Sequence, residues 1–249
     1  MVSTSTDLKI RWEKLPDDFI LPDDPVDNIT QPLLATALTD SLQVAGILSP
    51  QSITPTNYGI CATVNDKVVV KAPDWAYIPQ ITASRDEIER SYTPQLQGDI
   101  PAIVMEFLSE TDGAEYSIKP TYPPGKWFFY EQVLKVPNYV IFNPMTGILE
   151  LYQLDDSGQY KLQTPNENQQ YWIPEINLFL GVWQGTRNNR SGNWLRWWNE
   201  TGTLLLWGFE LAEEERIRAE LANQQAELAT QRAERLAAQL RAAGIEPED

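Results

Sequence analysis

Apolar and polar residues alternate in several short segments of the first two thirds of the chain, and this period of two is typical of β-strands. Residues 58–64 and 67–71 have this pattern on either side of Asn65 and Asp66. Both turn residues tolerate the left-handed backbone conformation, so a β-hairpin is predicted here. Further strands are predicted over residues 75–78, 100–109, 138–142, 148–154 and 159–162.

A period of three to four residues predicts a first helix that begins at Asn28 or Thr30 and ends at Ala45. Thr30 can cap its start, Pro32 suits its first turn, and Gly46 follows its end. The first thirty residues contain three prolines among several acidic residues, and we interpret them as an extended arm. The helix is expected to pack one of its faces on a sheet.

Two later segments also have helical patterns. Residues 125–134 are amphipathic, with aromatic residues on one side. Residues 210–243 contain neither Pro nor Gly and are rich in Ala, Glu, Arg, Gln and Leu, a composition typical of a long helix. Their leucines form a narrow, irregular heptad stripe, so we expect this helix to join copies of the chain into a homo-oligomer, a frayed tail being the alternative. The chain is accordingly divided into a domain of residues 1–208 and a helical tail of residues 209–249, a possible coiled coil.

Six of the nine tryptophans lie between residues 171 and 207, where arginines are interleaved with them. One interpretation is a set of further strands, with the rings in the core and the Arg side chains extended over them. The other is a stacking surface for single-stranded nucleic acid. The net charge of −16 opposes binding to phosphate backbones, which favours the first interpretation.

With 249 residues, 42% of them hydrophobic, the chain is long enough for a sizeable core in one large domain or two. The mixture of strands and helices predicts the α/β (α+β) class. No segment is long enough to span a bilayer, no secretory signal is found, and Cys61 is alone, so a cytoplasmic location is expected. The absence of His excludes Ser-His and Cys-His catalysis and His-ligated zinc.

Two carboxylates lie in or beside predicted strands. Glu106 stands inside the apolar run Ile-Val-Met-Glu-Phe-Leu, where an unpaired charge would be costly to bury, so it must be paired, protonated or bound to a cation. Asp74 directly precedes another predicted strand. Carboxylates on adjacent strands commonly hold Mg²⁺, which binds through one or two of them and keeps several waters. The alternatives are a structural ion pair of Glu106 with Lys71 or Lys126, and a simple turn residue at Asp74.

These pieces, in this order, resemble the core of the PD-(D/E)XK nuclease superfamily and, more narrowly, the Uma-type restriction endonuclease family of bacteria. The resemblance covers residues 25–162, with a looser similarity up to residue 206. The residues that carry it are Lys71-Ala72-Pro73-Asp74, Ile103-Val104-Met105-Glu106-Phe107-Leu108-Ser109, Gly125-Lys126-Trp127-Phe128-Phe129-Tyr130 and Tyr139-Val140-Ile141. The resemblance implies a restriction-endonuclease-like mixed sheet flanked by helices.

The resemblance implies that Asp74 and Glu106 are the ligands of Mg²⁺, or of Mn²⁺, beside a scissile phosphate. The Lys that the superfamily has two residues after the strand acid is replaced by Leu108. In the resembling family a Lys at the start of the following helix takes over, and Lys126 fits that place, from which its ammonium could orient the attacking water. The third ligand is not located, although Asp27 is the nearest candidate for the N-terminal acid of the family.

The implied function is metal-dependent hydrolysis of DNA by in-line attack of a metal-activated water. The retained Asp74 and Glu106 favour this function. The acidic net charge and Leu108 favour a different class, a catalytically silent nuclease-fold scaffold that assembles through its C-terminal helix and binds a protein partner. The expected partners are therefore DNA and a second copy of the chain, and no membrane.

Overall fold

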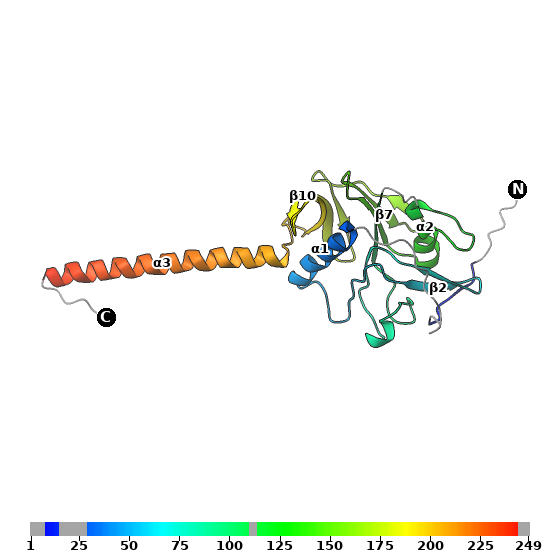
Figure 1. The fold of residues 1–249 in the computed structure, drawn as a ribbon, viewed down its shortest axis with the longest axis horizontal. Coiled ribbons are helices and arrows are strands. Elements are labelled where there is room, and N and C mark those ends of the chain that lie inside the picture. Colours follow the sequence, from blue (N-terminus) through cyan, green and yellow to red (C-terminus); the bar gives the residue numbers. More distant parts are fainter. Residues whose placement is uncertain (1–7, 15–28, 110–113, 244–249) are drawn as a thin grey trace. The chain divides into compact units, whose positions relative to one another are not determined.

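The structure of the protein is a computed structural model, which describes residues 8–14, 29–109 and 114–243. Its contacts divide the chain into two compact units, Met1–Leu205 and Leu206–Asp249. The first unit combines strands with short helices, and the second contains one long helix (Figure 1). The predicted α/β (α+β) class with a long C-terminal helix is therefore confirmed.

The first unit contains a five-stranded mixed sheet with the strand order β4-β5-β6-β7-β8. Its strands are β4 (Trp75–Tyr77), β5 (Ile103–Phe107), β6 (Asn138–Asn143), β7 (Ile148–Leu154) and β8 (Tyr160–Leu162). β5 and β6 are parallel, whereas the other neighbouring pairs are antiparallel. All residues of β4 and β5 are buried, as expected for strands with almost continuous apolar sequences. The predicted mixed sheet is confirmed.

Two three-stranded antiparallel sheets complete the first unit. One consists of β1 (Ile10–Arg11), β2 (Ile60–Val64) and β3 (Lys67–Lys71), and the other of β9 (Gln170–Ile173), β10 (Leu178–Arg187) and β11 (Arg190–Trp198). β2 and β3 form the predicted hairpin, in which Asn65 and Asp66 have φ angles of 50° and 62°. These left-handed values are those that the two residue types were expected to adopt.

The first helix, α1 (Thr30–Val44), packs against β11. Ile29 occupies its N-cap position with an already helical backbone, and its side chain makes no capping hydrogen bond. The predicted cap at Thr30 is therefore wrong, because Thr30 itself lies in the first turn. Gly46 follows the helix with a φ of 70°, as predicted for its end.

The segment between β5 and β6 is helical but not a uniform α-helix. α2 (Lys126–Phe128) is a single α-helical turn, which η3 (Phe129–Leu134) continues as a π-helix. Phe129 and Tyr130 are adjacent and both fully buried. Single 3₁₀ turns also occur at η1 (Asp86–Ile88) and η2 (Ala114–Tyr116).

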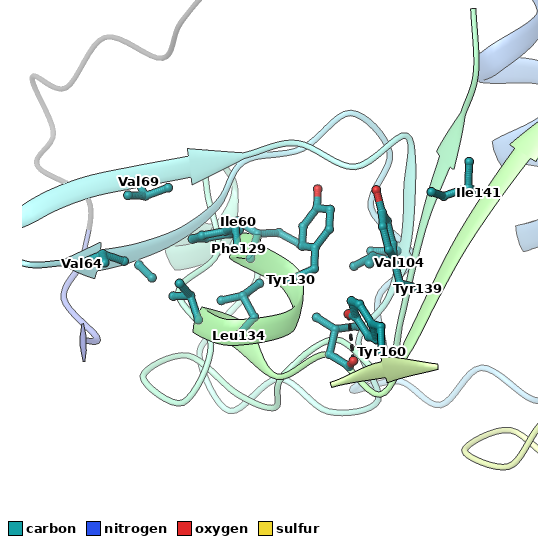
Figure 2. Close-up of a cluster of buried hydrophobic side chains, with 14 residues drawn as sticks. Ile60, Val64, Val69, Val104, Phe129, Tyr130, Leu134, Tyr139, Ile141 and Tyr160 are labelled. Atoms are coloured by element: carbon teal, nitrogen blue, oxygen red, sulfur yellow. Dashed lines mark hydrogen bonds between the residues drawn. The ribbon is translucent and has the colours of Figure 1, made fainter. Parts of the chain in front are cut away.

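The helical segment α2–η3 lies between the β2–β3 hairpin and the five-stranded sheet (Figure 2). All three parts contribute to one buried cluster, formed by Ile60, Ala62, Val64, Val69, Ala76, Val104, Phe129, Tyr130, Val133, Leu134, Val136, Tyr139, Ile141 and Tyr160. The rings of Tyr130 and Tyr139 are 5.2 Å apart, and Figure 2 shows their hydroxyl groups at the same end of the cluster. The packing of the core thus places the hydroxyl groups of Tyr130 and Tyr139 at the same end of the cluster.

The Trp-rich region forms part of the core. Trp194 and Trp197 have no exposed surface, so neither ring can stack on a nucleic-acid base. Trp183 is half-buried, and the guanidinium of Arg196 lies 5.3 Å from the centre of its ring. Arg196 is itself fully buried and donates a hydrogen bond to the Leu205 carbonyl at 2.8 Å. The expectation that arginines extend over the rings toward solvent is therefore wrong for Arg196.

The second unit contains α3 (Gly208–Ala242), a continuous helix in which no side chain is buried. Arg216 pairs with Glu213 and Glu220 along its surface, both at 2.6 Å, and such pairs support an exposed helix. Among the helices of the described ranges, α3 included, none has the length and apolar character that crossing a bilayer requires.

Ending the chain after Phe209 is expected to leave the first unit folded, because α3 buries no side chain. The shortened protein should keep a cooperative thermal transition and differ from the full chain only in its size on a gel-filtration column. Loss of the cooperative transition, measured by circular dichroism, would show that the tail belongs to the core.

Candidate active site

Asp74 lies directly before β4, and its neighbour Trp75 pairs with Met105 of β5. Because the two strands are antiparallel, the start of β4 lies beside the end of β5, and Asp74 stands opposite Glu106. The Asp74 carboxylate accepts a hydrogen bond from the backbone N–H of Phe107 at 2.5 Å. The two predicted acids therefore meet at one edge of the five-stranded sheet.

Glu106 is fully buried, and different groups hold its two oxygens. Its Oε2 accepts a hydrogen bond from Lys126 Nζ at 2.9 Å, and its Oε1 accepts one from the Tyr130 hydroxyl at 3.0 Å. Both donors come from the helical segment between β5 and β6. The sequence left three outcomes open for this acid, namely pairing, protonation or cation binding, and the structure shows pairing, with Lys126 as the partner.

Lys126 begins α2 directly after Gly125, at the N-cap. Its side chain is 25% exposed, whereas that of Glu106 is 1% exposed. The Lys126 side chain, unlike that of Glu106, is therefore partly accessible to solvent.

A third acid, Glu115 of η2, faces the same ammonium. Its Oε1 lies 3.8 Å from Lys126 Nζ, and its side chain is only 5% exposed. Its Oε2 is buried without a hydrogen-bond partner in the described part of the chain. The backbone carbonyl of Glu115 accepts a hydrogen bond from the Tyr139 hydroxyl at 2.9 Å. The site therefore contains three carboxylates around one ammonium.

Sequence reasoning missed Glu115, because it lies in a loop without apolar periodicity. The available signal was Gly125, directly before Lys126. A Cβ atom at Gly125 would lie 2.0 Å from the Ser117 carbonyl oxygen, so glycine allows the loop of Glu115 to approach the start of α2 closely.

Burial and the attraction between Glu106 and Lys126 have opposite effects on the pKa values of these two residues. Burial raises the pKa of Glu106 to about 8, although the Lys126 ammonium opposes the rise and the Asp74 carboxylate adds to it. Burial acts to lower the pKa of Lys126, but the three neighbouring carboxylates outweigh it, and this pKa is raised. Lys126 therefore stays charged at neutral pH, whereas Glu106 readily holds a proton.

The donor atoms of the site suit a hard divalent cation, which prefers carboxylate oxygens and binds through one or two of them while keeping waters. Asp74 and Glu106 provide two such groups, and their oxygens have acceptor capacity beyond the hydrogen bonds described above. In the residues that the structure describes, no group of three or more acids is arranged so that it could hold a metal ion by itself. The residues therefore fit a cation whose remaining ligands are waters or substrate oxygens.

Two further predicted positions have different outcomes. Leu108, which replaces the motif Lys, is half-buried and packs against the core cluster, so the ammonium beside Glu106 comes from Lys126. Asp27, the candidate for the N-terminal acid, lies outside the described residues.

A comparison with known protein families matches residues 54–186, just over half of the chain, to Uma2, described as "Putative restriction endonuclease". The matched part includes Asp74, Glu106, Glu115 and Lys126. No curated protein is similar enough to the chain to be matched. The family suggested by the sequence motifs is confirmed, and the chain belongs to the Uma2 family.

Proposed function

We propose that the protein is an endonuclease that hydrolyses phosphodiester bonds of DNA with Mg²⁺ or Mn²⁺ as its cofactor. The observation that carries this proposal is the position of Asp74 opposite Glu106, with the Lys126 ammonium 2.9 Å from Glu106. A structural ion pair would account for Glu106 and Lys126 but not for two more acids near the same ammonium, because like charges repel. Membership of the Uma2 family supports the nuclease class.

In this proposal Asp74 and Glu106 hold the cation, which supplies Lewis acidity and an activated water when bound. Tyr130 fixes one oxygen of Glu106, so the orientation of this carboxylate does not depend on the cation. Lys126 reaches solvent, and its ammonium can donate a hydrogen bond to a non-bridging phosphate oxygen and offset the charge that develops there.

The net charge of −16 opposes unassisted binding of DNA, so the cation also has to bring positive charge to the phosphate. The proposal therefore predicts that DNA binding and cleavage both require the divalent cation. Incubation of the full-length protein with supercoiled plasmid should produce nicked and linear DNA with Mg²⁺ or Mn²⁺, and none with a chelator. Calorimetry measures cation binding without DNA, and failure to bind either ion would refute the proposed function.

Cation binding is expected to strengthen as the pH rises to about 8. The pKa of Glu106 is about 8, so below this pH the carboxyl group holds a proton that the cation must displace. The apparent affinity for Mn²⁺ should fall by about tenfold per pH unit below pH 8 and level off above it. Calorimetry between about pH 6.5 and about pH 8.5 tests this expectation. An affinity independent of pH would contradict the assignment of Glu106 as a ligand.

A second function, assembly through α3, is favoured by a separate observation. The helix exposes a stripe of apolar side chains formed by Ile217, Leu221, Leu228, Leu236 and Leu240. We propose that copies of the chain associate along this stripe, in an irregular coiled coil. Analytical ultracentrifugation should show an oligomer for the full chain and a monomer for the chain ending at Phe209. If the full chain associates but binds no cation, the function is that of a scaffold.

A further inference from the structure

The Lys126 ammonium faces two buried carboxylates rather than one. Glu106 Oε2 lies 2.9 Å and Glu115 Oε1 lies 3.8 Å from its Nζ. The side chains of the two acids are 1% and 5% exposed, respectively. Burial of a second carboxylate is costly, and Glu115 Oε2 has no hydrogen-bond partner among the described residues. Hydrogen bonds among the described residues therefore do not explain the burial of the Glu115 carboxylate.

Contacts of the backbone fix Glu115 in place, independently of its carboxylate. The Tyr139 hydroxyl binds the Glu115 carbonyl at 2.9 Å, and the backbone N–H of Phe128 in α2 donates to the Ser117 carbonyl at 3.4 Å. Gly125 allows the close approach of Ser117 that a Cβ atom would prevent. The fold thus holds the Glu115 carboxylate beside Lys126 even when the ion pair is weak.

The proposed reaction explains why a second carboxylate, that of Glu115, lies beside Lys126. A cation bound to Glu106 competes with Lys126 for the same carboxylate and repels its ammonium. Lys126 would then be largely buried without the counter-charge that holds it at 2.9 Å. Glu115 is already near the ammonium, and its Oε2 has no hydrogen-bond partner within the described ranges, so Glu115 can become the main partner of Lys126.

We infer that Glu115 is a positioning residue that shares the Lys126 ammonium with Glu106 and keeps it in the site when Glu106 binds the cation. Its role during DNA hydrolysis rests on the proposed function, whereas the interaction of Glu106 and Glu115 with the same Lys126 ammonium does not. The two can therefore be tested separately.

The first test needs no metal. At about pH 9, above the pKa of Glu106 so that its carboxylate is ionised, it measures the rate at which an N-hydroxysuccinimide ester acetylates Lys126, by mass spectrometry, in the wild type and in E106Q, E115Q and the double variant. Each single variant should react within about threefold of the wild type, because one carboxylate still holds the ammonium, and the double variant should react about tenfold faster or more. A double variant that reacts no faster than E106Q would overturn the inference.

E150Q is the matched control. Glu150 accepts hydrogen bonds from the Tyr116 hydroxyl at 2.7 Å and the Tyr152 hydroxyl at 3.1 Å, so it borders η2 but serves other donors than Lys126. Its variant should leave the acetylation of Lys126 unchanged. If circular dichroism shows that the double variant does not fold, E106Q/E115D replaces it, with an intermediate rate expected because its carboxylate is one methylene further away.

The second test adds Mn²⁺ at saturating concentration. Lys126 of the wild type should stay protected, whereas Lys126 of E115Q should be acetylated about tenfold faster with Mn²⁺ than without it. Equal rates in E115Q with and without bound Mn²⁺ would overturn the role of Glu115 in the loaded site. If the wild type binds no Mn²⁺, the proposed function fails, and the metal-free measurements still decide whether Glu115 shares Lys126.

Discussion

Replacement of Asp74 by Asn is expected to reduce metal-dependent DNA hydrolysis by about a hundredfold or more. Asn keeps a side-chain oxygen that can accept the hydrogen bond from the Phe107 N–H, so the local backbone should be preserved. The substitution removes the negative charge next to Glu106. The expected loss is therefore one of cation binding and of the chemical step, and not of folding.

Three measurements separate these effects in the D74N variant. Calorimetry should show Mn²⁺ binding weakened by about tenfold or more, plasmid cleavage should be lost, and the melting temperature should change by only a few degrees. D99N is the control, because Asp99 is an exposed acid in the segment that leads to β5. D74N cleavage equal to that of the wild type would place the active site elsewhere.

The sequence predicted the two acids because each has a distinctive local context. Glu106 interrupts an apolar run that only a buried strand explains, and Asp74 directly precedes another strand that pairs with it. Alternation of side chains and turn chemistry are local properties, and they also predicted the hairpin turn at Asn65 and Asp66. The sequence thus predicted those residues whose environment depends on their neighbours along the chain.

Contacts between distant segments were not accessible in the same way. Glu115 reaches Lys126 because Gly125 and Ser117 approach each other closely, a contact that no periodicity encodes. Arg is a residue type usually found at the surface, yet the guanidinium of Arg196 is buried against Trp183. Such burial depends on how sheets and loops pack, and tertiary contacts override the preference of a residue type for the surface.

The position of the site ammonium illustrates the same limit. Leu108, directly after β5, replaces the motif Lys and packs against the core cluster, whereas Lys126 approaches Glu106 from the following helix. An ammonium at 2.9 Å has the same electrostatic effect on the carboxylate whichever element supplies it. The family resemblance identified Lys126 as the replacement for the motif Lys. The spacing along the chain alone shows only that the position two residues after Glu106 has no Lys.

Replacement of Trp197 by Ala is expected to lower the free energy of unfolding by about 3 to 5 kcal/mol. Trp197 has no exposed surface, its ring lies 6.1 Å from that of Trp75, and its indole N–H donates to the Leu38 carbonyl of α1 at 3.2 Å. The substitution leaves a cavity between β11 and α1 and removes this hydrogen bond. Urea denaturation followed by circular dichroism measures the change.

Two further variants separate the contributions of ring burial and hydrogen bonding. W197F keeps a large ring and loses the donor to Leu38, so its cost should be smaller, with about 1 kcal/mol from the hydrogen bond. W183A should also cost less than W197A, because Trp183 is half-buried and contacts the Arg196 guanidinium at its ring face. If W197A keeps the stability of the wild type, the structural role assigned to Trp197 is wrong.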